Sequence, residues 1–265
     1  FACDIYTTAA GDDSNRGIFS NAPKATLSSL LSTLDVEGGD VILIDAGVYP
    51  VTNSEPMAVT VSDQGKPSNP VIIRGNTNCT GSVFDRASYG TPSKAFLVQA
   101  SHMNVQDLGV KGGHFEANGQ QVALTNIVVT NGNFSVSGTG CRIADSKVYG
   151  GEVMFGSTNG SVERLNLWGG VVRLSGLNVL LRNSVIYNTN NSTALRIVSG
   201  ENMSILNNTV VSRGSAFGQA GLGSYSMLSN NILVADGAFP GDDFCIQMEG
   251  GILDSDYNNL VARNG

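Results

Sequence analysis

The feature that most constrains the fold is a repeat of about nineteen residues that fills most of the chain. Consecutive segments align at 96–113, 114–132, 133–151, 152–170, 171–192, 193–217, 218–243 and 244–265. Each holds short stretches of alternating apolar and polar residues, bounded by Gly or Asn, which predicts short strands and leaves no room for a helix. Units this small cannot bury an apolar face alone, so they must stack. The repeat therefore predicts an all-β parallel β-helix (solenoid), whereas a β-sandwich would not keep this register of turns.

One column of the alignment lies just before the second apolar stretch of each segment. It contains Asn126, Asp145, Arg164, Asn183, Asn208, Asn231 and Asn259. Asparagine tolerates the left-handed turn between two short strands, and its amide can bond the same amide one coil away, at about 4.8 Å. We therefore predict a structural ladder, rather than a binding site, formed by Asn126, Asn183, Asn208, Asn231 and Asn259.

The first 95 residues follow a different pattern. Asn21 can cap a helix over about 22–34, with Pro23 in its first turn and a stripe of leucines on one face. Such a short amphipathic helix would cover the open edge of the first coil. We expect one continuous domain, with a cap and first coils over 1–95 and regular coils of 18–26 residues over 96–265.

The segment from this leucine-rich helix through GDVILIDAGVYP to SDQGKPSNPVIIRG resembles the N-terminal cap and first coils of the secreted right-handed parallel β-helix (pectin-lyase-like) superfamily. The similarity is strongest to family 6 polysaccharide lyases, which act on alginate and chondroitin, and to their uncharacterised relatives. The resemblance implies a right-handed coil. It also implies that a Lys and an Arg on neighbouring coils transfer protons while carboxylates hold calcium.

The coil TALRIVSGENMSILNNTVV stands where those residues are expected, and it offers only Arg196 and Glu201. We therefore carry over no catalytic residue and predict no metal site and no cofactor, with calcium entering only if the chain is a lyase. If it is a lyase, the candidate residues are Arg173, Arg196 and Glu152, which align on one outward face. Two neighbouring guanidiniums could bind a uronate carboxylate, and one of them, with a lowered pKa, could act as a base. The simpler interpretation is an ion pair between Glu152 and Arg173 on a solvated face.

Two aromatic residues, Tyr149 and Trp168, come just before the Gly-Gly turns that end their coils. They could stack on sugar rings, although single aromatic residues more often pack beneath a loop.

The net charge and the lengths of the apolar runs limit the kinds of partner that we expect. The chain has a formal net charge of −7 with 15 Lys plus Arg, and no apolar run approaches the roughly 18 residues of a membrane span. A row of phosphates could not be neutralised by so few cations, so nucleic acid is excluded as a predicted partner.

The cysteines and sequons fit an extracellular protein, and the cysteines are expected to be either disulfides or buried thiols. Cys3 and Cys79 both belong to the N-terminal part and form a possible disulfide, while Cys141 and Cys245 lie too many coils apart to bond. Possible glycosylation sites are Asn78, Asn159, Asn190 and Asn202. The chain begins with Phe1 rather than methionine, as expected of a mature chain or an excised segment.

The last segment ends in NNLVARNG without a helix, proline or charged cluster. Open strand edges accept another chain, so head-to-tail stacking of copies is one expectation. The alternatives are a longer solenoid or a loop, such as 235–243, folded over the rim.

From these observations our leading hypothesis is a secreted, non-catalytic structural or self-assembling subunit. The first alternative is a polysaccharide lyase or hydrolase acting on acidic glycans, and the second is a carbohydrate-binding module of a larger surface protein.

Overall fold

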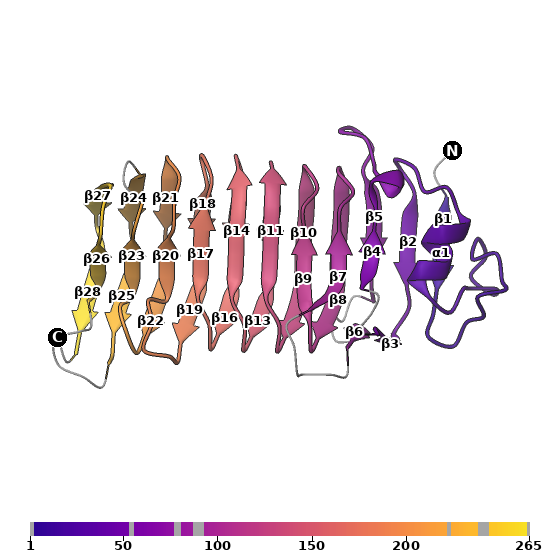
Figure 1. Ribbon diagram of the computed structural model, residues 1–265, viewed down its shortest axis with the longest axis horizontal. Helices are drawn as coiled ribbons and strands as arrows, with labels where there is room; N and C mark the ends of the chain where they lie inside the picture. Colours follow the sequence, from indigo (N-terminus) through magenta and orange to yellow (C-terminus); the bar gives the residue numbers. More distant parts are fainter. Residues whose placement is uncertain are drawn as a thin grey trace. The chain divides into compact units, whose positions relative to one another are not determined.

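The computed structural model describes residues 3–52, 56–76, 81–86, 93–221, 224–237 and 244–263. The chain is an all-β, right-handed parallel β-helix, as the repeat and the resemblance predicted. Its contacts divide it into two compact units, an N-terminal unit (Phe1–Asn133) and a C-terminal unit (Phe134–Gly265). Figure 1 labels the strands, and in each unit the strands of successive coils lie side by side.

The N-terminal unit contains three series of parallel strands. Its elements are β1 (Asp4–Thr7), α1 (Leu27–Thr33), β2 (Val41–Ile44), β3 (Gly47–Pro50), β4 (Met57–Val59), η1 (Val61–Asp63), β5 (Val71–Arg74), β6 (Ser82–Asp85), β7 (Lys94–Val98), β8 (Met103–Lys111), β9 (His114–Ala117) and β10 (Val122–Thr130). The pairs run β1–β2–β5–β8–β10, β3–β6–β8 and β4–β7–β9. Between the sheets the buried rings of Phe96 and Phe115 stack with centroids 5.1 Å apart.

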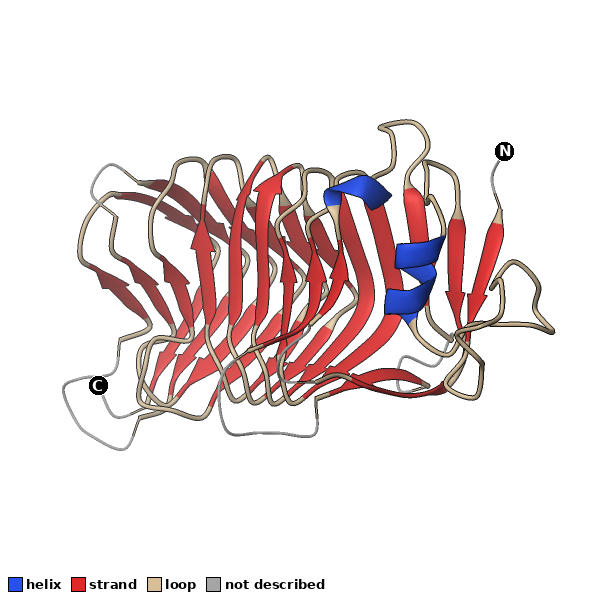
Figure 2. Ribbon diagram, turned by 45° about the vertical axis from the view of Figure 1, so that its right-hand side comes forward, coloured by secondary structure: helices blue, strands red, loops and turns tan. Residues whose placement is uncertain are grey.

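The predicted helix exists but is shorter than expected. It begins at Leu27, because Thr26 rather than Asn21 is the N-cap and accepts a hydrogen bond from the Ser29 N–H. The preceding Lys24 is held as an extended residue by a parallel bridge to Thr7. Leu27 and Leu30 are buried, and α1 packs beside β4, the first strand of its sheet. Figure 2 shows the helix alongside the strands of the N-terminal unit. The helix thus covers an open strand edge, as predicted.

The C-terminal unit repeats one coil of three short strands. Its strands are β11 (Phe134–Thr139), β12 (Arg142–Ala144), β13 (Lys147–Tyr149), β14 (Val153–Thr158), β15 (Ser161–Glu163), β16 (Asn166–Trp168), β17 (Val172–Ser175), β18 (Leu180–Arg182), β19 (Val185–Asn188), β20 (Leu195–Ile197), β21 (Met203–Leu206), β22 (Thr209–Ser212), β23 (Phe217–Gln219), β24 (Tyr225–Ser229), β25 (Ile232–Ala235), β26 (Ile246–Met248), β27 (Ile252–Asp256) and β28 (Asn259–Ala262).

These strands form three parallel stacks. The first stack is β11–β14–β17–β20–β23–β26, the second is β12–β15–β18–β21–β24–β27, and the third is β13–β16–β19–β22–β25–β28. Apolar residues at matching positions fill the interior, so that Val162, Leu181 and Ile205 lie over one another and are fully buried.

A two-residue turn joins the second stack to the third. Its first residue has positive φ, and this column is Asp145, Arg164, Asn183, Asn207, Asn230 and Tyr257. The second residues of these turns form a separate column, which consists of Ser184, Asn208, Asn231 and Asn258. The predicted ladder therefore mixes two columns, because the alignment slips by one residue after Asn183. Asn259 lies on β28 opposite Ile232, and Asn258 takes the ladder position instead.

The second column is a buried amide ladder. Asn208 and Asn231 are each 1% exposed. The Asn231 Oδ1 accepts from the Asn208 N–H at 2.9 Å and from the Asn208 Nδ2 at 3.0 Å. One coil on, the Asn258 Oδ1 accepts from the Asn231 N–H at 2.8 Å and the Asn231 Nδ2 at 3.0 Å. In the N-terminal unit, Asn126 has positive φ, like the residues of the first column. Its side chain donates one hydrogen bond to Asp107 at 2.7 Å.

Two expectations about the last coil, its stacking on another copy and its covering by a loop, stay predictions. The last described coil exposes Ile252 (65%) and Leu260 (50%), but head-to-tail stacking has no test in a single chain. Most of the loop 235–243, which could fold over that coil, lies outside the described residues. Within the described part of the chain, no helix has the length and apolarity needed to cross a membrane.

Candidate functional site

The outward face of the first stack brings the three candidate residues of the lyase hypothesis together. Arg173 on β17 and Arg196 on β20 are register partners, as the alignment predicted. Glu152, just before β14, binds Arg173 through two hydrogen bonds of 3.0 and 3.2 Å. The second guanidinium lies 3.4 Å from a carboxylate oxygen of Glu249.

This geometry favours the ion-pair interpretation over catalysis. The hydrogen bond that Arg173 donates to Glu152 raises the pKa of Arg173, although burial opposes it. Abstracting a proton would require the opposite shift, so the idea of an arginine base with a lowered pKa is wrong for this residue. Arg173 and Arg196 are therefore both paired with carboxylates in this structure.

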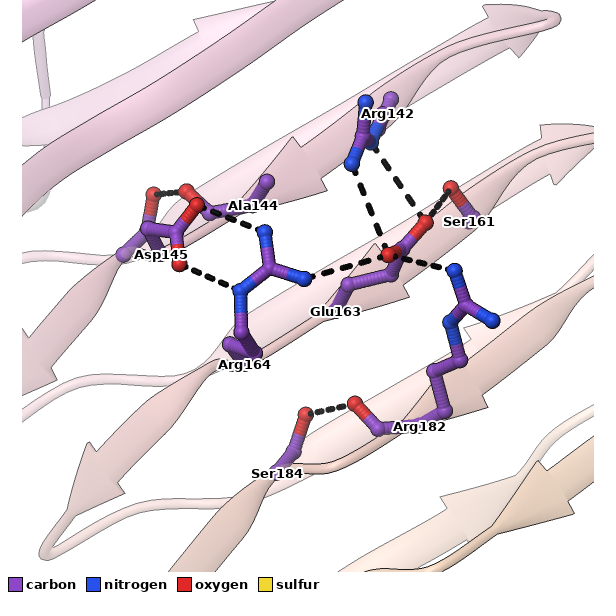
Figure 3. A network of polar contacts seen from close by, with 9 residues as sticks. Arg142, Ala144, Asp145, Ser161, Glu163, Arg164, Arg182 and Ser184 are labelled. Atoms are coloured by element: carbon purple, nitrogen blue, oxygen red, sulfur yellow. Dashed lines mark hydrogen bonds and ion pairs between the residues drawn. The ribbon is translucent and has the colours of Figure 1, made fainter.

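A second cluster, which sequence reasoning did not find, is centred on Glu163 at the end of β15 (Figure 3). The Glu163 side chain is 7% exposed, and three arginine side chains between 44% and 48% exposed surround it. The nearest oxygen–nitrogen distances are 3.5 Å to Arg142, 3.4 Å to Arg164 and 2.9 Å to Arg182. Ser161 donates a further hydrogen bond at 3.2 Å. We call Arg142, Asp145, Glu163, Arg164 and Arg182 the arginine network.

The coil spacing explains the network. Arg182 is the register partner of Glu163 one coil on, and the small Ala144 is its partner one coil back. Glu163 and Arg182 are separated in the sequence by the length of one regular coil, and this opposite-charge spacing is a signal that could have found them.

The arginine network contains two ionised carboxylates and has more positive than negative charge. Burial raises the pKa of Glu163. The hydrogen bond from Arg182 and the charges of Arg142 and Arg182 lower it by more than burial raises it, so the pKa lies below its usual value. Asp145 binds the Nη2 of Arg164 at 2.7 Å, and this hydrogen bond lowers the pKa of Asp145. Three guanidiniums thus face two carboxylates, leaving one net positive charge on an acidic chain.

Replacing Glu163 with glutamine should lower the free energy of unfolding by about 1 kcal/mol at about pH 7, a value reduced for solvent screening of the half-exposed guanidiniums. Because the folded pKa of Glu163 is depressed, its charge stabilises the fold above the unfolded pKa of about 4.3 and loses this effect as pH falls through the folded pKa. Urea unfolding at about pH 7 and about pH 3 should therefore show the difference shrinking in acid.

The control is Glu249→Gln, which removes one carboxylate that is 51% exposed and has one guanidinium partner. It should change stability by less than about 0.5 kcal/mol at either pH. An equal loss for Glu163→Gln at both pH values would contradict a charge-based role.

A row of aromatic side chains lies on the third stack of the same coils. Tyr149 on β13, Trp168 on β16 and Tyr187 on β19 are register partners on successive strands. Tyr149 is 40% exposed and Trp168 48%, and the rings of Trp168 and Tyr187 lie with centroids 4.9 Å apart. We call these three residues the aromatic row. The sequence indicated Tyr149 and Trp168 but missed Tyr187, although one regular coil length separates each of the three from the next.

The aromatic row and the arginine network border the same corner. In each coil the two-residue turn that begins at Asp145 or Arg164 separates them, and the ring of Trp168 follows Arg164 by only four residues, about 13 Å of extended chain. The aromatic side chains and the guanidiniums thus lie on consecutive strands of the same coils.

The disulfide prediction cannot be placed, because Cys79 lies outside the described residues, as does the sequon residue Asn78. Cys3 is exposed and Cys141 and Cys245 are buried, and no disulfide joins these three described cysteines to one another. The separation of Cys141 from Cys245 agrees with the prediction that they do not pair.

Two predicted glycosylation sites belong to an unforeseen second ladder. Asn159, Asn178 and Asn202 stack in exposed turns of positive φ, with amide contacts of 2.7 and 3.0 Å. The Asn202 Nδ2, the atom that a glycan would modify, already donates to Asn178. Asn190 is exposed after β19. Glycosylation at these positions stays a prediction.

Over the described residues, no cluster of three or more His, Cys, Asp or Glu side chains is placed to hold a metal ion. Calcium, expected only for a lyase, therefore has no candidate ligand set within those ranges.

Comparison with known proteins shows the fold alone. No protein-family profile matches the sequence, and no curated protein does. Among solved structures, the chain is similar to pectate lyase Pel9A (TM-score 0.65, 15% identity, covering 98% of this chain and 77% of that one). It is also similar to a rhamnogalacturonan lyase (0.58, 15%, 89% and 75%) and to an alginate lyase from Paenibacillus sp. str. FPU-7 (0.54, 16%, 97% and 99%). The chain thus has the right-handed parallel β-helix fold of these lyases, as the resemblance implied.

Proposed function

We propose that this protein binds an acidic polysaccharide through the C-terminal unit. The aromatic row stacks on the apolar faces of sugar rings, and the arginine network pairs with carboxylates. The observation that carries the proposal is the in-register row of Tyr149, Trp168 and Tyr187, which lies on the strands that directly follow those of the arginine network. Strands one coil apart are separated by about 4.8 Å, so a polymer running across the coils would meet a ring at each step.

The charge of the network favours an acidic ligand. The chain carries a net charge of −7 and should repel polyanions in general, so exposed arginines gathered at one place offer a local attraction. Planar guanidiniums match carboxylates with two hydrogen bonds. Glu163 keeps three of them in fixed positions, which lowers the entropy that a ligand must remove on binding.

The similar β-helix lyases act on acidic or rhamnogalacturonan polymers by name, which supports the same ligand class here through fold analogy. Cleavage is not part of the proposal, because Arg173 has no support as a base. Acidic polysaccharides of walls and capsules lie outside cells, so the proposal includes secretion. Filament formation, expected from the sequence, stays a prediction and is not part of the proposal.

Affinity electrophoresis in gels containing polygalacturonate, alginate or chondroitin tests the proposal, with dextran as the neutral polymer. We expect retardation in at least one acidic gel, none in dextran, and loss of retardation in about 0.5 M salt, because solvent-exposed ion pairs are screened. Ultraviolet absorbance of the same mixtures would reveal unsaturated products and hence a lyase. Equal retardation by dextran, or none by any acidic polymer, would refute the proposal.

Charge-matched variants separate the site from the overall charge. The double variant Arg142→Gln/Arg182→Gln should lose most retardation, whereas Arg16→Gln/Lys66→Gln, which removes two exposed cations of the N-terminal unit, should retain it. Thermal unfolding of both variants should establish that they are folded.

A further inference from the structure

A pocket of about 540 Å³ lies at the end of the aromatic row in the C-terminal unit. Its walls include Tyr187, the last ring of the row, together with Asn191, Ser212, Arg213 and Asp236. Arg213 and Asp236 come directly after β22 and β25, which are register partners, so the two side chains leave neighbouring coils at matching points. The volume lies within the range of small-molecule sites in proteins.

The backbone around the pocket is held by buried polar groups. The fully buried Asn188 donates from Nδ2 to the Ser192 carbonyl at 2.7 Å and accepts the Asn190 N–H at 3.0 Å. The buried Ser212 hydroxyl donates to the same carbonyl at 2.9 Å and accepts the Gly214 N–H at 3.1 Å. These bonds fix both the loop that carries Asn191 and the chain on either side of Arg213. The pocket is therefore preformed.

Its charges favour an anion. Asp236 is already paired with Arg263 at 3.2 Å, which offsets its negative charge. Arg213 makes a backbone hydrogen bond to the Asn188 carbonyl, but within the described residues its guanidinium has no hydrogen bond or ion pair. It contrasts with the arginines of the network and with Arg173, which all hold carboxylates. A carboxylate bound between these walls would give Arg213 the partner that the others have.

We propose that this pocket binds one carboxylate-bearing sugar unit, with the carboxylate on Arg213 and the sugar ring against Tyr187. The ligand class rests on the proposed function, since the pocket continues the aromatic row and would receive one uronate of the same polymer. The exposed Asn191 also lines the pocket and would lie beside the sugar hydroxyls. This site adds a fixed position at which the polymer is recognised by its acid group.

Fluorescence of the single tryptophan, Trp168, gives a direct readout, because its ring lies 4.9 Å from that of Tyr187 in the pocket wall. Titration with galacturonate and with glucuronate should give a saturable change for at least one of them, and galactose and glucose should give none. Arg213→Gln should weaken uronate binding about tenfold, the effect of losing hydrogen bonds to a charged group. The control Arg16→Gln should bind as the wild type does, and both variants should unfold at the wild-type temperature.

Several results would overturn the pocket. These are equal affinity for galactose and galacturonate, wild-type affinity in Arg213→Gln, no saturable change with either uronate, or binding of galactose 6-sulfate in place of the uronates. The polymer assay keeps the two proposals distinct. If acidic gels retard the protein but uronate monosaccharides do not bind, only the pocket fails. If uronates bind through Arg213 but no acidic gel retards the protein, the polymer proposal fails and the pocket stands.

Discussion

Replacing Asn231 with alanine should lower the free energy of unfolding by about 3 kcal/mol, the largest stability effect that we expect from a single polar side chain here. Its amide is 1% exposed and makes hydrogen bonds to Asn208, to Asn258 and to the Ile205 carbonyl at 2.9 Å. Alanine would leave the buried Asn208 N–H and the Ile205 carbonyl without these partners, and each such loss costs about 1–3 kcal/mol.

Asn259→Ala is the matched control, because the same residue type sits in the next coil but lies exposed on β28 outside the ladder. It should change stability by less than about 0.5 kcal/mol. Urea unfolding followed by circular dichroism measures both variants. Equal losses in the two would show that the ladder runs through Asn259 after all, and negligible losses in both would deny the ladder any role in stability.

Replacing Trp168 with alanine should weaken binding to the best acidic polymer about thirtyfold, because a central tryptophan of a binding surface commonly contributes about 2 kcal/mol or more. Trp168 is the middle ring of the aromatic row and is 48% exposed, so its removal interrupts the row on both sides. Tyr149→Ala should weaken binding less, since it shortens the row only at one end.

Tyr225→Ala provides the control for aromatic loss. Tyr225 is 39% exposed on β24 of the second stack and belongs neither to the aromatic row nor to the arginine network. Affinity electrophoresis over a range of polymer concentrations gives the ratio of dissociation constants for each variant. Equal weakening in Tyr225→Ala and Trp168→Ala would mean that the aromatic row is not the binding surface.

The regular coils could be predicted closely, and the irregular ones could not. Tyr149 and Trp168 lie one regular coil length apart in the sequence and are register partners, as simple counting requires. Asn183 and Asn208 are separated by a longer coil, and there the alignment slipped by one position. The turn has two adjacent polar positions, one exposed with positive φ and one buried, and either accepts asparagine. Composition alone does not distinguish them.

The candidate site was predicted in parts. The partnership of Arg173 with Arg196 and its ion pair with Glu152 followed from the alignment. The arginine network was not predicted. Its centre is a glutamate buried beneath guanidiniums from three successive coils, and the burial of a charged residue depends on neighbours that the local sequence does not reveal.

The amino-acid sequence by itself determined the solenoid, its coil length and its stacked columns, because a short repeat can bury its apolar face only against its own copies. The tertiary structure alone decided which polar residue of each turn points inward and which charges meet. It also decided where a pocket opens beside Tyr187 and Arg213. Loops of variable length shift the register of the coils, and a shift of one residue turns a side chain from the inside of the solenoid to the outside.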